Sequence, residues 1–262
     1  MSTGSLLVPE PVKWTYIYAL AGDPSAEAWH RDEWLPGLAK LDGIDRVVAH
    51  RTREAPQPED VARPLNAWTG LVEVHLREPD LLRSVLAARV QEHVGGRFLA
   101  VRGLLSTIRE EYDLRRDLPA QQHPYLTEAI TWKGSPPPAE EPVDGDLWRY
   151  VYFFRYRDEV PWVDGEDWYL GHHTREGRQL PGLRRYVTWR RRRDDRLDAA
   201  TAAQLNGFAR YTELCFESFE AWHRATHSHG PRWRMDERHP AGVWTDYQQL
   251  FVGATPDIDI TA

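Results

Sequence analysis

An internal repetition constrains this chain of 262 residues more than any other feature. The segment Trp14–Leu20 has the pattern Trp-x-Tyr-(Ile/Val)-Tyr, and the same pattern returns at Trp148–Phe154. Aromatic and β-branched residues at this density are typical of β-strands, so we expect a strand at each place. A pattern that returns after half the chain predicts two copies of one structural unit.

The residues that follow the two strands continue the parallel. Apolar residues at near-helical spacing predict a helix around Trp29 and another around Trp168. Each Trp is followed fourteen residues later by a glycine, Gly43 or Gly182, which suits a helix C-cap. A second strand is expected directly after each glycine.

The later parts of the two units also correspond. Leu71–Leu76 is similar to Tyr211–Phe216, with Glu73 at the position of Glu213. The order strand, helix, strand, strand, helix, strand is therefore expected twice, and this order defines the ferredoxin-like βαββαβ unit. We predict an α+β fold of two ferredoxin-like repeats, whose antiparallel sheets pack as a pseudo-dimeric α/β barrel around a small cavity.

Proline and glycine mark the expected boundaries of the repeats. The ranges are a flexible arm at 1–11, a diverged first repeat at 12–132, a Pro-rich linker at 133–146 and a second repeat at 147–262. Either Phe98–Ile108 or Tyr125–Trp132 closes the first sheet, and the sequence leaves both open. A long loop from His227 to Val243 is a candidate lid over the cavity.

Composition narrows the range of partners. The net charge of -7 and the pI near 5.9 lack the basic footprint of a nucleic-acid binder. No apolar run approaches the roughly 18 residues that span a bilayer, and the N-terminus does not resemble a signal peptide, so we expect a cytoplasmic protein. The partner is expected to be a small molecule. Because two repeats already form a pseudo-dimer, a monomer and a homodimer both stay open.

The second repeat carries a family resemblance. His172 and His173 in the expected helix are followed by Leu180–Tyr186, which reads Leu-Pro-Gly-Leu-Arg-Arg-Tyr. This resembles the EthD family of the dimeric α/β-barrel superfamily, whose first helix carries a histidine and ends in such a turn. The first repeat departs from the pattern, with Glu33 and Trp34 in place of the histidine pair. The resemblance implies the barrel fold; the superfamily includes cofactor-free cyclases, decarboxylases and monooxygenases, and a branch that binds haem.

Four side chains are candidate acids or bases. His173 and Glu176 lie three residues apart on the expected helix, so the carboxylate is placed to orient the imidazole as a general base. His172 is the second candidate; both histidines have the alternative of a place on the helix surface. Glu213, in mid-strand like Glu73, is either a base with a raised pKa in the cavity or an exposed edge residue.

Tyrosines are the candidate substrate-binding residues. Those on the repeated strands alternate onto one face, where they would line the barrel cavity with aromatic walls and phenolic donors. The alternative is that they pack against the helices as core. The set comprises Tyr16, Tyr18, Tyr150, Tyr152 and Tyr211.

A second candidate site, for a metal ion, lies nearer the C-terminus. Glu220, His223 and His227 share one helical face at a spacing that suits Zn²⁺ or non-haem iron. Without an HExxH pattern, a solvated face is the favoured interpretation, and the main hypothesis has neither metal nor cofactor.

The functional hypothesis follows from these candidates. We expect a cofactor-independent enzyme of the lyase type that acts on an aromatic or polyketide-like small molecule, by cyclisation, decarboxylation or C–C cleavage. The alternatives are a non-catalytic small-ligand-binding barrel, and a haem- or metal-dependent or cofactor-free monooxygenase.

Overall fold

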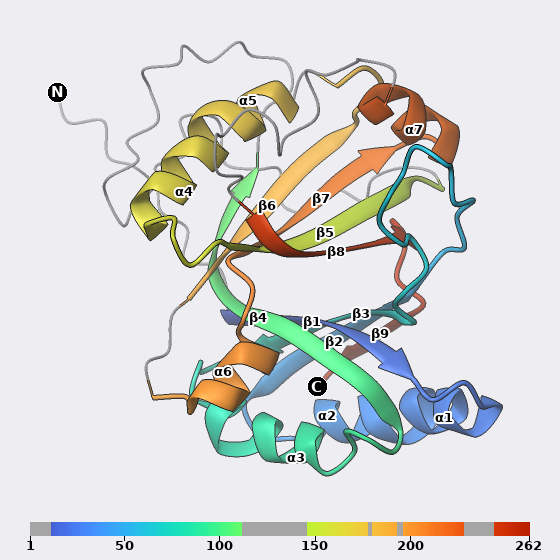
Figure 1. Ribbon diagram of the computed structural model, residues 1–262. Coiled ribbons are helices and arrows are strands. Elements are labelled where there is room, and N and C mark those ends of the chain that lie inside the picture. Colours follow the sequence, from blue (N-terminus) through green and yellow to red (C-terminus); the bar gives the residue numbers. More distant parts are fainter. Residues whose placement is uncertain (1–11, 112–145, 178–179, 193–195, 228–243) are drawn as a thin grey trace, which may run out of the picture.

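A computed structural model describes residues 12–111, 146–177, 180–192, 196–227 and 244–262 of the chain, without the side chains of 107–111, 171, 172, 175 and 176. Its strands form one antiparallel sheet in the order β8-β5-β7-β6-β4-β1-β3-β2-β9. Figure 1 shows that this sheet folds over, so that the strands of the two halves face one another with helices outside.

The first half of the chain has the strand order β4-β1-β3-β2. Its first helical segment includes a π-helical turn, η1, and its second includes η2. The elements are β1 (Val12–Leu20), α1 (Pro24–Trp29), η1 (His30–Trp34), α2 (Leu35–Ala39), β2 (Ile44–Arg51), β3 (Gly70–Leu76), η2 (Leu82–Leu86), α3 (Ala87–Gln91) and β4 (Phe98–Glu111).

The second half has the order β8-β5-β7-β6, which is the same order counted from its own first strand. Its first helical segment again includes a π-helical turn, η4. The elements are β5 (Trp148–Tyr156), α4 (Trp162–Trp168), η4 (Tyr169–His173), α5 (Thr174–Gly177), β6 (Arg185–Arg191), α6 (Ala199–Leu205), β7 (Arg210–Phe216), α7 (Phe219–His227), β8 (Trp244–Gly253) and β9 (Ile258–Thr261).

The sheet topology decides which predicted strand closes the first sheet, whereas several other predicted segments lie outside the described residues. Strand β4 pairs with β1, so Phe98–Ile108 closes the first sheet. The rival strand Tyr125–Trp132, the arm at 1–11, nearly all of the linker at 133–146 and most of the loop from His227 to Val243 lie outside the described residues. No helix in the described part is long and apolar enough to cross a membrane.

The repeated tyrosines face the helices, not the space between the facing strands. Tyr16 and Tyr18 belong to the core between the first half of the sheet and its helices, and Tyr150 and Tyr152 to the corresponding core of the second half. The prediction that these side chains line the interior of the barrel is therefore wrong. Both faces of β1 and β5 carry large buried apolar residues, so the alternation defined two faces without showing which one looks inward. The inner core contains, among others, Ile17, Leu71, Val151, Phe153 and Tyr211.

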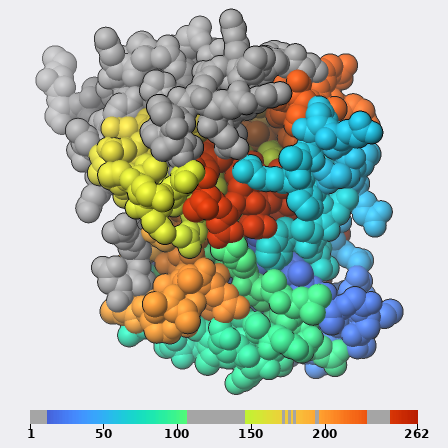
Figure 2. All heavy atoms as spheres, viewed as in Figure 1, coloured from blue at the N-terminus to red at the C-terminus, as the bar shows by residue number. Residues whose placement is uncertain are grey.

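Each half sends a connection across to cover the other. Residues 52–69, between β2 and β3, form what we call the exchanged arm, and its Ala55, Val61 and Leu65 are buried in the core of the second half. In Figure 1 this cyan segment lies beside α7, and Figure 2 shows it against the red and orange atoms of the second half. In return, Leu205 of α6 is buried in the core of the first half, where its carbonyl accepts a 2.9 Å hydrogen bond from Trp14 Nε1.

Candidate functional site

A cavity of about 500 Å³ lies on the helix side of the second half. Strands β5 and β8, the turn η4, helix α7 and the exchanged arm all contribute to its lining. Most of the large side chains around it are aromatic, namely Tyr150, Tyr152, Tyr186, Trp222, Trp244 and Tyr247. A volume of this size suits a small organic ligand.

His173 is the titratable group at the centre of this lining. Its Nε2 is 2.9 Å from the hydroxyl of Tyr152, and its ring stacks on Trp168 and meets Trp244 edge-on. Burial lowers the pKa of His173 to about 3, so the imidazole is neutral at physiological pH. A neutral imidazole has a free lone pair for a proton, but so low a pKa makes it a weak base, so base action at His173 requires a negative charge on a bound substrate to offset the cost of burial.

A chain of hydroxyl groups continues from His173 towards the sheet. The Tyr152 hydroxyl lies 3.4 Å from those of Tyr169 and Tyr186, and the Tyr169 hydroxyl donates to Thr188 Oγ1 at 3.2 Å. Burial raises the pKa of both Tyr152 and Tyr186 well above the usual value of tyrosine. These phenols therefore stay protonated and can donate hydrogen bonds.

A buried ion pair holds the helix that carries His173 against the sheet. Glu166 of α4 accepts hydrogen bonds from Arg210 Nε at 2.8 Å and Nη2 at 2.6 Å, and another from the Tyr156 hydroxyl. Although burial opposes it, Arg210 keeps the pKa of Glu166 below its usual range. Sequence reasoning missed this pair; the available signal was an arginine at the start of the apolar strand β7, with an acid in the expected helix.

Glu213 and Tyr211 lie elsewhere, between the facing strands of the two halves. Tyr211 donates to Glu213 at 2.8 Å, Lys13 pairs with Glu73 at 2.7 Å, and Arg149 lies 3.5 Å from both carboxylates. Burial alone would raise the pKa of Glu213, but Arg149 and Lys13 hold it below the usual range. The expectation of a raised pKa is wrong because Arg149 of the neighbouring strand β5, and after it Lys13 of the first half, supply compensating positive charge.

The other predicted residues are divided between the two halves. Tyr150 and Tyr152 line the cavity of the second half, whereas Tyr18 lines a smaller one, of about 240 Å³, in the first. His172 belongs to η4 and Glu176 to α5, but the positions of both side chains lie outside the described part of the chain. The predicted contact between Glu176 and His173 stays a prediction.

Solved structures resemble this arrangement, although no family model and no curated protein matches the sequence. One, an anthrone oxidase-like protein, has a TM-score of 0.55 at 13% identity, covering 97% of this chain and 94% of that one. The fold is that of the dimeric α/β barrels. Another similar structure, chlorite dismutase from Candidatus Nitrospira defluvii, has a TM-score of 0.49 at 12% identity over 96% of this chain and 94% of that one.

The fold also brings together three side chains of types that can bind a metal ion. The sequence placed Glu220 with His223 and His227, but in the structure it is Asp60 of the exchanged arm that joins the two histidines. The potential ligand atoms of Asp60, His223 and His227 lie within 4.8 Å of one another. Asp60 and His227 also line the 500 Å³ cavity. No local pattern in the sequence relates Asp60 to helix α7.

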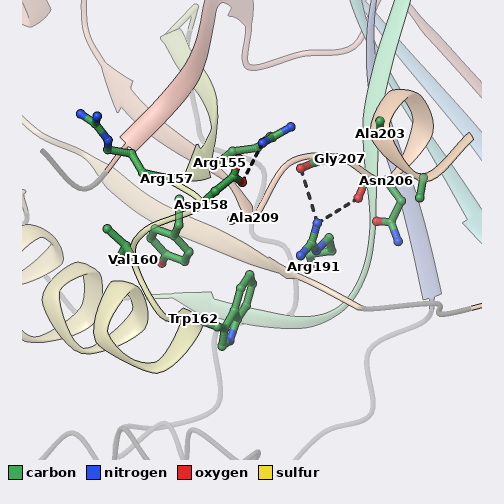
Figure 3. Close-up of a pocket in the computed structure, with 12 residues that line it drawn as sticks. Arg155, Arg157, Asp158, Val160, Trp162, Arg191, Ala203, Asn206, Gly207 and Ala209 are labelled. Atoms are coloured by element: carbon green, nitrogen blue, oxygen red, sulfur yellow. Dashed lines mark hydrogen bonds and ion pairs between the residues drawn. The ribbon is translucent and has the colours of Figure 1, made fainter. Parts of the chain in front are cut away.

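Another cavity of the barrel, of about 320 Å³, has a different character (Figure 3). Its three arginines are already engaged: Arg155 pairs with Asp158, Arg157 pairs with Glu159, and Arg191 donates to the carbonyls of Asn206 and Gly207. It has no histidine among its lining residues. We therefore place the candidate active site in the cavity that contains His173.

Proposed function

We propose that the protein is an enzyme that oxidises an aromatic, polyketide-like small molecule with dioxygen, without a bound cofactor, in the cavity of the second half. This is the cofactor-free monooxygenase alternative of the sequence analysis, preferred here over a lyase or cyclase. The observation that carries it is the buried, neutral His173, hydrogen-bonded to Tyr152 in an aromatic-walled cavity. Similarity in fold to an anthrone oxidase-like protein adds support for the oxidation of a fused-ring substrate.

We also propose that the chain is a fused pseudo-dimer of two EthD-like repeats. The shared strand order of the two halves and the reciprocal exchange of their connections support this origin. In such a chain, one repeat is free to lose the site while it keeps its role as scaffold. The second repeat, which contains His173, is the one that keeps the site.

The chemistry begins with proton removal from the substrate. An anthrone has a CH₂ group made acidic by two flanking rings and a carbonyl across the ring. The Tyr152 oxygen takes this proton as its own passes to His173 Nε2, which is 2.9 Å away. Tyr247, whose hydroxyl is 2.9 Å from that of Tyr150, also lines the cavity, and by turning from Tyr150 it would donate to the oxygen where negative charge develops.

Dioxygen then completes the reaction. The substrate anion gives one electron to dioxygen, and the resulting radical pair combines to form a peroxide anion, C–OO⁻, which takes the proton from His173 and becomes C–OOH. His173, again through Tyr152, then takes the second hydrogen of that carbon as a proton while the O–O bond breaks, which gives the carbonyl and releases hydroxide. His173 returns its proton to the hydroxide, so that anthrone and O₂ become quinone and water.

Dioxygen uptake with a hydroxylated anthrone tests the proposal. We expect chelator-treated protein to consume one O₂ for each quinone formed, well above the uncatalysed rate. A Tyr152→Phe variant should lose about 10²-fold in kcat, because the proton carrier is gone. Tyr18→Phe removes the matching hydroxyl from the first half and should leave the rate unchanged. Conversion that continues without O₂, or no acceleration at all, would contradict the proposal.

A further inference from the structure

The group of Asp60, His223 and His227 joins two segments that are distant in the chain. His223 and His227 lie one helical turn apart on α7, so both rings project from the same face. Asp60 comes from the exchanged arm, which lies beside α7 in Figure 1. A ligand bound by all three side chains would therefore tie the arm of the first half to a helix of the second.

The distances within the group suit a metal ion. His223 Nε2 lies 2.9 Å from one oxygen of Asp60 and 3.2 Å from the other. Metal bonds of about 2.0–2.2 Å keep neighbouring ligand atoms roughly 3.0–3.4 Å apart, so an ion can replace the proton between this nitrogen and oxygen with little movement. The rings of His223 and His227 already stack at 4.9 Å between centroids.

Thr226 prepares His227 as a ligand. The Thr226 hydroxyl donates to the carbonyl of Trp222 at 2.8 Å, so its oxygen is left to accept from Nδ1–H of His227, 2.7 Å away. This arrangement leaves the lone pair of His227 on Nε2. A hydrogen bond that fixes the tautomer in this way is the usual support of a histidine ligand.

We propose that Asp60, His223 and His227 bind one divalent transition-metal ion, such as Zn²⁺, and that the ion fastens the exchanged arm over the cavity. Two imidazole nitrogens and one carboxylate favour Zn²⁺ and its neighbours over Mg²⁺ or Ca²⁺, which prefer ligand sets made of oxygen. Three protein ligands leave a fourth position for water or for a ligand from the cavity, which His227 lines. The inference stands on these contacts and does not depend on the proposed function.

Metal titration of untagged, chelator-treated protein tests the site. We expect one Zn²⁺ to bind with a Kd in the micromolar range or tighter by calorimetry, and Co²⁺ to give the visible absorption of a site of low symmetry. Asp60→Asn, His223→Gln and His227→Gln should each weaken Zn²⁺ binding at least tenfold. Glu220→Gln changes an acid on the same helix that is outside the group, and it should bind Zn²⁺ like the wild type.

Limited proteolysis tests the fastening. Saturating Zn²⁺ should slow cleavage within residues 52–69 in the wild type and in Glu220→Gln, but not in His227→Gln. Circular dichroism of each variant checks that it is folded. The site is overturned if Zn²⁺ does not saturate below millimolar concentration, or if folded Asp60→Asn binds it unchanged. Binding with no effect on cleavage of the arm would overturn the fastening role. Neither readout uses turnover.

Discussion

The helix-covered faces of the two halves have the same strand order but different contents. In the second half, His173 contacts Tyr152 beside a cavity of about 500 Å³. In the first half, Trp34 donates to Tyr16 at 2.9 Å and packs against Trp29, and the cavity nearby has about half that volume. The indole of Trp34 fills space in the first half that corresponds to the open cavity beside His173 in the second. On the proposed function, the first half thus contributes stability and the second half the chemistry.

A buried neutral histidine does not by itself distinguish the halves. His30 of η1 stacks on Tyr18 with ring centroids 4.2 Å apart, and burial lowers its pKa to about 3, as it does for His173. The difference is in the hydrogen bonds. His30 Nε2 has no partner among the described residues, whereas His173 Nε2 meets the hydroxyl chain that begins at Tyr152. Contact with buried hydroxyl groups, and not burial alone, distinguishes His173 from His30.

Replacement of His173 or of His30 by glutamine should give the largest difference in activity between the two halves. His173→Gln keeps a hydrogen-bonding side chain but removes the base, so kcat for dioxygen uptake should fall by about 10²–10⁴-fold. His30→Gln should retain the wild-type rate. Steady-state kinetics at saturating substrate measure both, and an equal loss in the two variants would remove the distinction between the halves.

The ion pairs of the first helices should separate the halves in stability. Glu166→Gln leaves the fully buried Arg210 without its counter-charge, and about 3–5 kcal/mol of unfolding free energy should be lost. Glu27 occupies the first helix of the other half, where its pair with Arg51 is exposed, so Glu27→Gln should cost no more than about 1 kcal/mol. Urea unfolding followed by tryptophan fluorescence gives both values; similar losses would argue against a special role for the buried pair.

The pH dependence of the unfolding free energy should show whether His30 of the first half is buried and neutral. Between its pKa of about 3 in the folded protein and about 6.5 in the unfolded chain, the unfolded state binds more protons at His30. The stabilising contribution of neutral, buried His30 is therefore complete above about pH 6.5 and is lost as the pH falls towards about 3. His30→Phe should reduce the slope of unfolding free energy against pH by up to about 1.4 kcal/mol per unit between roughly pH 6 and 4. An unchanged slope in urea titrations would mean that His30 is not buried and neutral.

A larger side chain in the cavity of the second half should bring its volume closer to that of the first half. Its effect should be the smallest of those predicted. Ala62 of the exchanged arm is exposed and lines the cavity, so Ala62→Trp should raise KM about fivefold, roughly 1 kcal/mol, with little change in stability. Glu59→Trp alters the same arm at a residue that does not line this cavity. If Glu59→Trp raises KM equally, the effect belongs to the arm and not to the cavity.

Much of the fold could be predicted from the sequence because strand patterns are local. The expected order of strand, helix, strand, strand, helix, strand is found in both halves, except that the second half also has α6 between β6 and β7 and the strand β9. The repeated Trp-x-Tyr pattern could not predict which face of β1 and β5 looks inward, because Ile17 and Tyr16 are both apolar enough for a core. A register of one residue decides that question, and only packing between the halves sets it.

The site was less accessible to sequence reasoning because its partners are far apart in the chain. His173 was a candidate from its helix, but its observed partner is Tyr152, on a strand whose facing direction was misjudged. Asp60 reaches α7 only because the exchanged arm crosses between the halves, and no local pattern contains that path. Long-range pairing of this kind becomes visible only in the folded chain.

A crystal structure with a bound anthraquinone, the product type of the proposed reaction, tests the central claim most directly. The account predicts that the ligand lies in the cavity of the second half, within hydrogen-bonding distance of Tyr152 and next to His173. Binding in the smaller cavity beside Tyr18 and His30, or between the facing strands near Glu213, would contradict the assignment of chemistry to the second half.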